Sequence, residues 1–182
     1  GLSICAEAIE RWHSEHEPTP DTLMAAERVA VESGDWAAVI NNLEQQVRLL
    51  EGVDAVEALR RAASLCDNAL HDQSRAAQLW NQLLQSQSDD VEAWSARLDC
   101  LSRCGDDAGL IDAIQTLWGE GVDHRPLLLQ AGLSLIEHAT DDIPATVDMV
   151  ATRLLSPDHE EAEDERLYML AVAHLETPAG PA

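Results

Sequence analysis

Residues 72–106 read DQSRAAQLWNQLLQSQSDDVEAWSARLDCLSRCGD, and this stretch contains the pattern that decides the fold. Apolar residues recur every three or four positions in both of its halves, which is the spacing of one face of an α-helix. The stripe in 73–87 is Ala76, Leu79, Trp80, Leu83 and Leu84, and the stripe in 91–104 is Val91, Trp94, Leu98 and Leu101. The stretch therefore predicts two consecutive helices, joined by a polar segment at Asp89 and Asp90.

Similar stripes continue along the rest of the chain, and strand signals are nearly absent. The further stripes occur in 2–13, 23–33, 36–50, 55–70, 110–118, 127–138, 145–155 and 167–175. The composition agrees, because aromatic residues make up only 3 % and Ala and Leu, both good helix formers, carry the apolar content. Sandwiches and barrels depend instead on β-branched and aromatic residues. We therefore predict an all-α protein of about ten helices.

The breaks between helices also repeat. Four pairs each end one helix and open the next: Gly34-Asp35, His71-Asp72, Gly105-Asp106 and Thr140-Asp141. The spacings between their aspartates are 37, 34 and 35 residues, and a large apolar residue follows each aspartate after eight positions. These residues are Leu43, Trp80, Ile114 and Met149, and the same step of 34 links Cys66 to Cys100. A period of this length with two helices in each unit predicts a helical solenoid.

Several helix starts carry capping signals. Asp54 is followed three residues later by Glu57, and Asp89 by Glu92, in the order of a capping box. Thr19-Pro20 and Ser156-Pro157 place a capping residue before a proline, which is tolerated in the first turn because its missing N–H needs no partner there. We expect helices to begin at these four places.

These residues resemble the tetratricopeptide repeat (TPR) family. Ala76 and Trp80 with Leu83-Leu84 after them look like the second helix of that repeat, and 89–94 with Trp94 looks like the entry into its next first helix. The family expects a small residue midway along the first helix, which is Ser64 in one repeat, but Leu98 occupies that position in the next. Other paired-helix repeats would show the same period.

The resemblance implies an α-solenoid of paired antiparallel helices that form a right-handed superhelix. The whole chain, 1–182, is then one domain of about four to five repeats, with 57–90 and 91–124 the best defined and 177–182 a C-terminal tail. The resemblance also implies a concave face that is lined by first helices and binds a peptide or another protein.

Polar residues off the apolar stripes of the first helices are the candidate binding residues of that groove. They are Arg61 and Asn68 in one helix and Ser95, Asp99, Ser102 and Arg103 in the next. In the family, clamps that bind peptide carboxylates use Lys, Arg and Asn at such places. The alternative is that these polar residues belong to an ordinary solvated surface. A second candidate is the acidic run 158–165, in which Glu160 and Glu161 would dock a basic partner or form a solvated helix face.

The charge of the chain limits the classes of partner. The formal net charge is −23, and all 11 basic residues are arginine. Because nucleic-acid affinity rests on clustered cations, no nucleic-acid partner is expected. The acidity favours a basic partner, or it is an adaptation to a salt-rich cytoplasm, and the preference for arginine also fits a GC-rich genome. The sequence has no apolar run of about 18 residues, so no membrane insertion is expected. We also expect a cytoplasmic protein, and self-association stays open.

Catalytic motifs are missing from the sequence. It contains no HExxH or CxxC spacing, no glycine-rich phosphate loop and no GxSxG elbow. In the segment His13-Ser-Glu-His16, Glu10, His13 and Glu17 could share a helical face as metal ligands. No second cluster supplies the missing ligands, and a solvated face is the simpler interpretation. The four cysteines are too few for a disulfide scaffold and are expected to be buried free thiols.

We therefore predict a non-enzymatic interaction module or scaffold without a cofactor or metal. The alternative is a regulatory or sensor segment of a larger enzyme or of a secretion or assembly machine.

Overall fold

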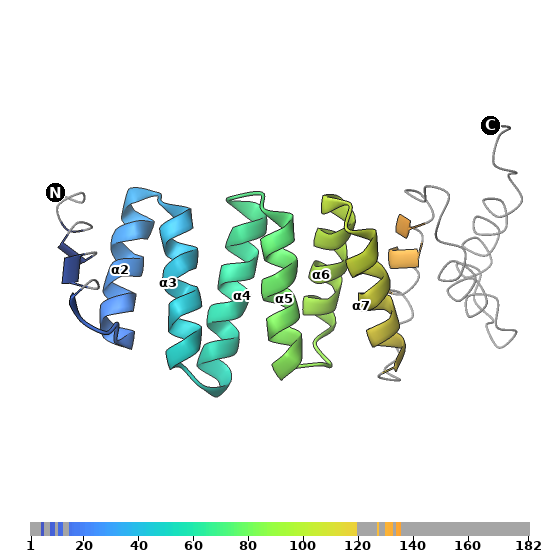
Figure 1. Ribbon diagram of the computed structural model, residues 1–182, viewed down its shortest axis with the longest axis horizontal. Helices are drawn as coiled ribbons and strands as arrows, with labels where there is room; N and C mark the ends of the chain where they lie inside the picture. The colour runs from blue at the N-terminus through green and yellow to red at the C-terminus, as the bar shows by residue number, and fades with distance from the viewer. Residues whose placement is uncertain are drawn as a thin grey trace, which may run out of the picture. The chain divides into compact units, whose positions relative to one another are not determined.

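The computed structural model describes residues 15–119 without a gap. It also describes Cys5, Ala8, Ile9, Arg11, Trp12, Leu127, Gln130, Ala131, Gly132, Ser134 and Leu135. All regular elements among these residues are helices (Figure 1). They are α2 (Pro20–Ser33), α3 (Trp36–Leu49), α4 (Gly52–Asn68), α5 (Gln73–Ser86), α6 (Val91–Cys104) and α7 (Asp107–Gly119). The described residues of the predicted helices 2–13 and 127–138 are helical too. The helices predicted in 145–155 and 167–175, the breaks at Thr140-Asp141 and Ser156-Pro157, and the tail 177–182 lie outside the described residues.

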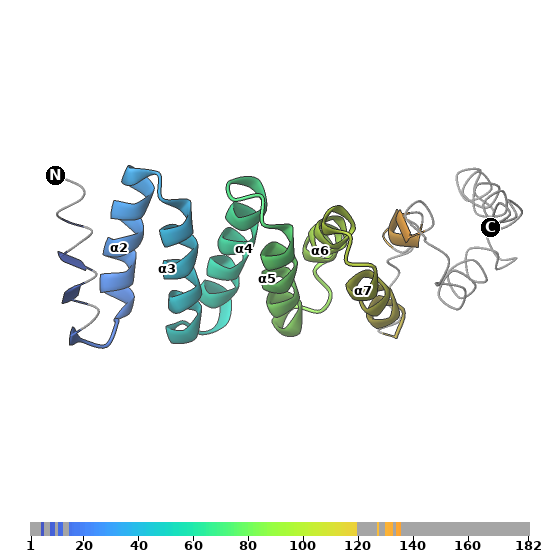
Figure 2. The ribbon, with the colours of Figure 1, turned by 45° about the horizontal axis from the view of Figure 1, so that its top comes forward.

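The chain divides into two compact units, Gly1–Cys100 and Leu101–Ala182. In the first unit, α3 packs against both α2 and α4, and α4 packs against both α3 and α5. Consecutive helices run antiparallel, so that each helix lies beside its sequence neighbours (Figures 1 and 2). The second unit contains α7. The described helices confirm the predicted all-α fold of paired antiparallel helices.

Aspartate caps open the second helix of each described pair, as the repeated breaks predict. In each case the side-chain oxygen accepts a hydrogen bond from the backbone N–H three residues later, which otherwise has no partner in the helix. The bonds are Ala38 N to Asp35 Oδ1 at 3.0 Å, Arg75 N to Asp72 Oδ1 at 3.0 Å and Gly109 N to Asp106 Oδ1 at 2.9 Å.

The residue before each capping aspartate has left-handed backbone geometry. Gly34 has φ of 74° and Gly105 has φ of 70°, as expected where only glycine avoids a steric cost. His71 occupies the corresponding position with φ of 54°, an unfavourable value for a residue with a Cβ atom. The pair of a left-handed residue and an aspartate therefore ends one helix and starts the next.

The hydrogen bonds at these breaks show which residues of the first helices correspond. The backbone N–H of the capping aspartate donates to Ala30 in the first pair, Cys66 in the second and Leu101 in the third. Cys66 therefore corresponds to Leu101, and the step in the first helices is 35 residues, not the 34 that pairs Cys66 with Cys100.

Burial supports the same register. Five buried residues of α4 recur 35 positions later in α6: Ala58, Leu59, Ala62, Ala63 and Cys66 match Ala93, Trp94, Arg97, Leu98 and Leu101. Ala63, rather than Ser64, is therefore the counterpart of Leu98. The second helices keep the step of 34, because the connection between Cys66 and Asp72 is one residue longer than the connection between Leu101 and Asp106.

The capping predictions elsewhere have mixed outcomes. Thr19 caps α2 as predicted, since its backbone N–H donates to Thr22 Oγ1 at 3.0 Å and its hydroxyl accepts from the backbone N–H of Thr22 at 3.4 Å. The prediction for Asp54 is wrong because α4 begins earlier, at Gly52, which places Asp54 inside the first turn. The prediction for Asp89 is off by one residue, because Asp90 Oδ1 accepts from the backbone N–H of Ala93 at 3.0 Å.

The tryptophans of the deciding stretch are core residues, in agreement with their places on the apolar stripes. Trp80 is 5 % exposed and Trp94 is 2 % exposed. The Trp94 indole donates from Nε1 to the backbone oxygen of Ser88 at 2.8 Å, whereas Trp80 Nε1 is buried without a hydrogen-bond partner. Packing therefore accounts for the burial of Trp80.

All four cysteines are free thiols, in agreement with the prediction. Cys66 and Cys100 are buried, but Cys5 and Cys104 are exposed, so the expectation of burial was wrong for those two. Burial raises the pKa of the Cys66 thiol to about 11, which keeps it protonated and unreactive at neutral pH. Among the described helices, none combines the length and the hydropathy that a membrane-spanning segment needs.

Candidate partner-binding surfaces

Arg61, predicted as a groove residue, forms part of a polar cluster between helices. Its guanidinium on α4 forms an ion pair with Glu27 on α2, and Gln46 on α3 donates from Nε2 to Glu27 Oε2 at 2.8 Å. Glu27 is 9 % exposed and Gln46 is 6 % exposed. A buried carboxylate needs such partners, because its desolvation is otherwise uncompensated. The cluster around Glu27 thus links α2, α3 and α4.

The remaining groove residues of the first unit lie at or near the surface. Asn68 is exposed and donates from Nδ2 to the backbone oxygen of Ser64 at 2.8 Å, a bond within its own helix. Asp99 is exposed and Ser95 is half-buried, both on α6. These three residues lie on two first helices, α4 and α6, and are kept as candidate surface residues.

Other predicted site residues belong to the second unit or lie outside the described residues. Arg103 is exposed in the last turn of α6, and the hydroxyl of Ser102 lies within hydrogen-bond distance of the Ser134 hydroxyl. Glu160 and Glu161 lie outside the described residues. So do Glu10 and His13 of the hypothetical metal site. His16 of that site stacks on Trp12 with 4.7 Å between ring centroids, and no metal-binding group of three ligands occurs among the described side chains.

Arg60 forms contacts between helices that no feature of the sequence predicted. Its guanidinium forms an ion pair with Asp90 and another with Glu92 at 3.3 Å, and its Cζ lies 6.0 Å from the ring centroid of Trp80. Burial alone would raise the pKa of Asp90, but the N–H of Ala93 and the hydrogen bond and charge of Arg60 outweigh burial and lower that pKa. Arg60 therefore joins α4 to the start of α6 in the same way that Arg61 joins α4 to α2.

The second helices of the first unit carry a different surface, which we call the α3–α5 face: Asn41, Glu44, Gln45 and Arg48 on α3, and Ser74, Arg75, Gln78 and Gln82 on α5. Arg75 donates from Nε to Glu44 Oε1 at 3.0 Å and from Nη2 to Asn41 Oδ1 at 2.7 Å. These bonds link α5 to α3. The signal in the sequence was the run of amide side chains at the outer positions of both helices.

Two hollows open on the α3–α5 face. One has a volume of about 430 Å³ and is lined by Pro18, Asn41, Glu44, Gln45, Arg48 and Leu49. The other has a volume of about 500 Å³, and its lining includes Glu44, Arg48, Asp72, Ser74, Arg75, Gln78 and Gln82. Glu44 and Arg48 line both hollows, so these two residues form their shared wall.

The geometry defines a fold class, that of the TPR-like helical repeats. A solved structure with a similar fold is a tetratricopeptide repeat protein from Parabacteroides merdae ATCC 43184, with a TM-score of 0.55 and 12 % sequence identity. The match covers 86 % of this chain and 60 % of that chain. No model of a known protein family matches the sequence, and no curated protein matches it. The structural match supports a TPR-like helical-repeat fold.

Proposed function

We propose that this chain is a non-catalytic helical-repeat module that recruits a protein or peptide partner on the exposed face of its first helices. The observation that carries this proposal is a pair of exposed apolar side chains on α2. Met24 is 57 % exposed and Val31 is 44 % exposed, and their separation of seven residues, about two helical turns, places them on the same side of the helix. Apolar side chains that stay exposed beside polar ones are typical anchors of a protein interface.

The polar part of the same surface consists of Asn68, Ser95 and Asp99. Asn68 and Asp99 are exposed and Ser95 is half-buried, and we assign them to positioning of the partner, since polar contacts around an apolar anchor fix orientation more than they add affinity. Arg61 is left out of this surface because its guanidinium already pairs with Glu27. Arg103, in the second unit, is proposed as a separate partner contact.

The acidic run 158–165 has a different proposed role. With a net charge of −23 for the chain, we propose that Glu160 and Glu161 attract a basic surface of the partner and speed its encounter with the module. Such exposed charges act over about 8 Å at physiological salt, so their contribution falls as salt rises.

The test is a binding measurement with the full chain and a partner captured by it. Met24→Asp with Val31→Asp should weaken the complex at least tenfold, because charged groups replace the apolar anchors. Leu70→Asp is the matched control, since Leu70 is also an exposed apolar residue, at 37 %, but lies in the connection between α4 and α5. Equal losses in the two proteins, or no loss in either, would overturn the assignment to the first helices.

A further inference from the structure

The α3–α5 face differs in charge from the rest of the chain. Glu44 and Arg48 on α3 cancel, and Arg75 on α5 cancels Asp72, the cap of α5 that lines the second hollow, so the face is neutral, whereas the whole chain has −23. Most outer positions of these helices carry amide side chains instead of carboxylates. An anionic group of a partner therefore meets less repulsion over this face than the overall charge suggests.

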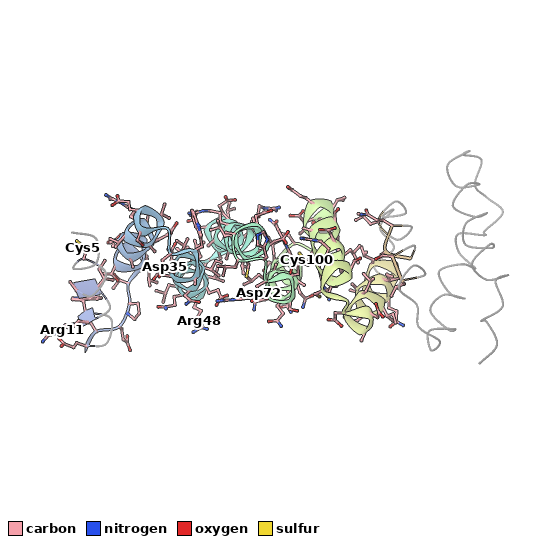
Figure 3. All side chains as sticks on the ribbon, turned by 90° about the horizontal axis from the view of Figure 1, so that it is seen from above. Cys5, Arg11, Asp35, Arg48, Asp72 and Cys100 are labelled. Carbon is pink, nitrogen blue, oxygen red and sulfur yellow. The ribbon has the colours of Figure 1, made fainter. Side chains whose placement is uncertain are left out.

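The positive charge of the face is concentrated on Arg48. The charge of Arg75 is matched by Glu44, at 2.8 Å, whereas Arg48 forms no ion pair or hydrogen bond with any side chain that the structure describes. Arg48 is exposed, and Figure 3 shows its side chain projecting outwards from α3. Because a guanidinium stays charged at every physiological pH and donates in a planar fork, Arg48 offers a ready contact to a carboxylate.

Neutral amide side chains line the same hollow as this charge. Asn41 Oδ1 accepts from Arg75, so the free hydrogen-bonding group of Asn41 is its NH₂, a donor. Gln45 lines the same hollow as Asn41 and Arg48, and Leu49 and Pro18 add apolar surface at its edge. Its volume of about 430 Å³ lies within the usual range of roughly 300–1,000 Å³ for ligand sites.

We propose that the α3–α5 face binds a segment of a partner protein that carries one acidic side chain among uncharged residues. Arg48 pairs with the carboxylate, the amides of Asn41 and Gln45 donate to the remaining oxygen positions, and Leu49 contacts an apolar neighbour. One uncompensated cation matches one monoanion. A dianionic phosphate would leave a surplus negative charge within the field of a strongly acidic protein, so the chemistry favours a carboxylate. This site is distinct from the first-helix surface proposed above.

The test uses two capped pentapeptides as probes, acetyl-Gln-Ala-Glu-Ala-Leu-amide and its counterpart with Gln in place of Glu. Each is titrated into the ¹⁵N-labelled full chain at about 0.15 M salt, where charge effects beyond roughly 8 Å are screened. We expect the Glu peptide to shift the side-chain signals of Arg48, Asn41 and Gln45, and the Gln peptide to bind about tenfold more weakly, the value of one charge-assisted hydrogen bond.

Arg48→Gln should reduce the affinity for the Glu peptide to that of the Gln peptide. Arg28→Gln on α2 is the matched control, since Arg28 is likewise exposed, likewise has no described ion pair and changes the net charge equally. Equal losses in the two variants would overturn the site, because they would show an effect of overall charge. The site would also be overturned if the signal shifts were confined to α2, α4 and α6, or if both peptides bound equally. Shifts at Arg48 that are stronger with inorganic phosphate than with the Glu peptide would overturn the choice of a carboxylate. The site would stand if the Met24 and Val31 variants lost their partner but bound the Glu peptide normally, and the two proposals can therefore fail separately.

Discussion

Arg60 and Arg61 are consecutive residues on α4, and their side chains pair with acidic residues of different repeats. Arg61 pairs with Glu27 on α2, whereas Arg60 pairs with Asp90 and Glu92 at the start of α6. Successive residues of a helix differ in direction by about 100°, so two adjacent cations can reach both neighbours of one helix. This dipeptide links three successive first helices of the chain.

The link from Arg61 to Glu27 predicts a measurable loss of stability. Arg61→Ala leaves the Glu27 carboxylate with Gln46 as its described side-chain partner, and we expect the free energy of unfolding to fall by about 1–2 kcal/mol. This value is below that of a fully buried pair because the Arg61 side chain is 48 % exposed. Urea denaturation measures it, with Asn68→Ala as the control on the same helix. A loss for Arg61→Ala no larger than the control would show that the cluster is unimportant for folding.

Removal of Trp80 should have the largest effect among these substitutions. Trp80 is 5 % exposed, and Trp80→Ala leaves a cavity that costs about 3–5 kcal/mol. Trp36→Ala is the matched control, because Trp36 is 38 % exposed, and its loss should stay below about 1 kcal/mol. Thermal or urea unfolding compares the two variants. Similar losses would contradict the packing of α5 described above.

The left-handed residue at position 71 offers a stabilising substitution. His71→Gly relieves the unfavourable φ of 54°, and we expect a gain of about 0.5–1 kcal/mol despite the greater freedom of glycine in the unfolded chain. The reverse change, Gly34→Ala, should cost about 1 kcal/mol from backbone strain alone, because no atom lies within 4 Å of the added Cβ. Unfolding experiments on both variants should therefore show shifts of opposite sign, and shifts of the same sign would exclude backbone strain as the cause.

The lowered pKa of Asp90 predicts a dependence of stability on pH. A carboxyl whose pKa is lower in the folded state stabilises the protein above its unfolded pKa, near 3.8, and this contribution is lost as the pH falls through the folded pKa. Asp90→Asn keeps a capping oxygen but removes the charge. We expect the variant to be less stable than the parent at pH 7 and the difference to shrink towards pH 3. If the difference in stability between the variant and the parent stays constant with pH, the lost stability comes from the cap and not from the ion pair with Arg60.

The proposed roles of the acidic run and of Arg103 predict different kinetic effects on partner binding. Glu160→Gln with Glu161→Gln should lower the association rate more than it raises the dissociation rate, and the effect should vanish at high salt. Arg103→Ala should raise the dissociation rate instead, because a direct contact is lost. Surface plasmon resonance at several salt concentrations separates the two rate constants. An affinity that depends neither on salt nor on the two glutamates would assign the acidity to solubility alone.

Local features of the fold could be predicted from the sequence because their causes are local. The stripe of Ala76 and Trp80 shows the helical period, and the breaks at Asp35, Asp72 and Asp106 combine a helix stop with a cap inside a few residues. The spacing between these aspartates gives the repeat period directly. The paired-helix class and the burial of Trp80 could therefore be predicted without tertiary information.

Contacts between repeats were decided only in the tertiary structure. They join residues about 30 positions apart, and a shift of one residue turns a side chain by about 100°, so a period known to within one residue does not select a partner. The extra residue between Cys66 and Asp72 is such a shift, and it makes Ala63 instead of Ser64 the counterpart of Leu98. For the same reason, Arg61 was predicted in the groove but pairs with buried Glu27. The pairing of Arg75 with Glu44, which leaves Arg48 as the cation of the α3–α5 face, also emerged only in the tertiary structure.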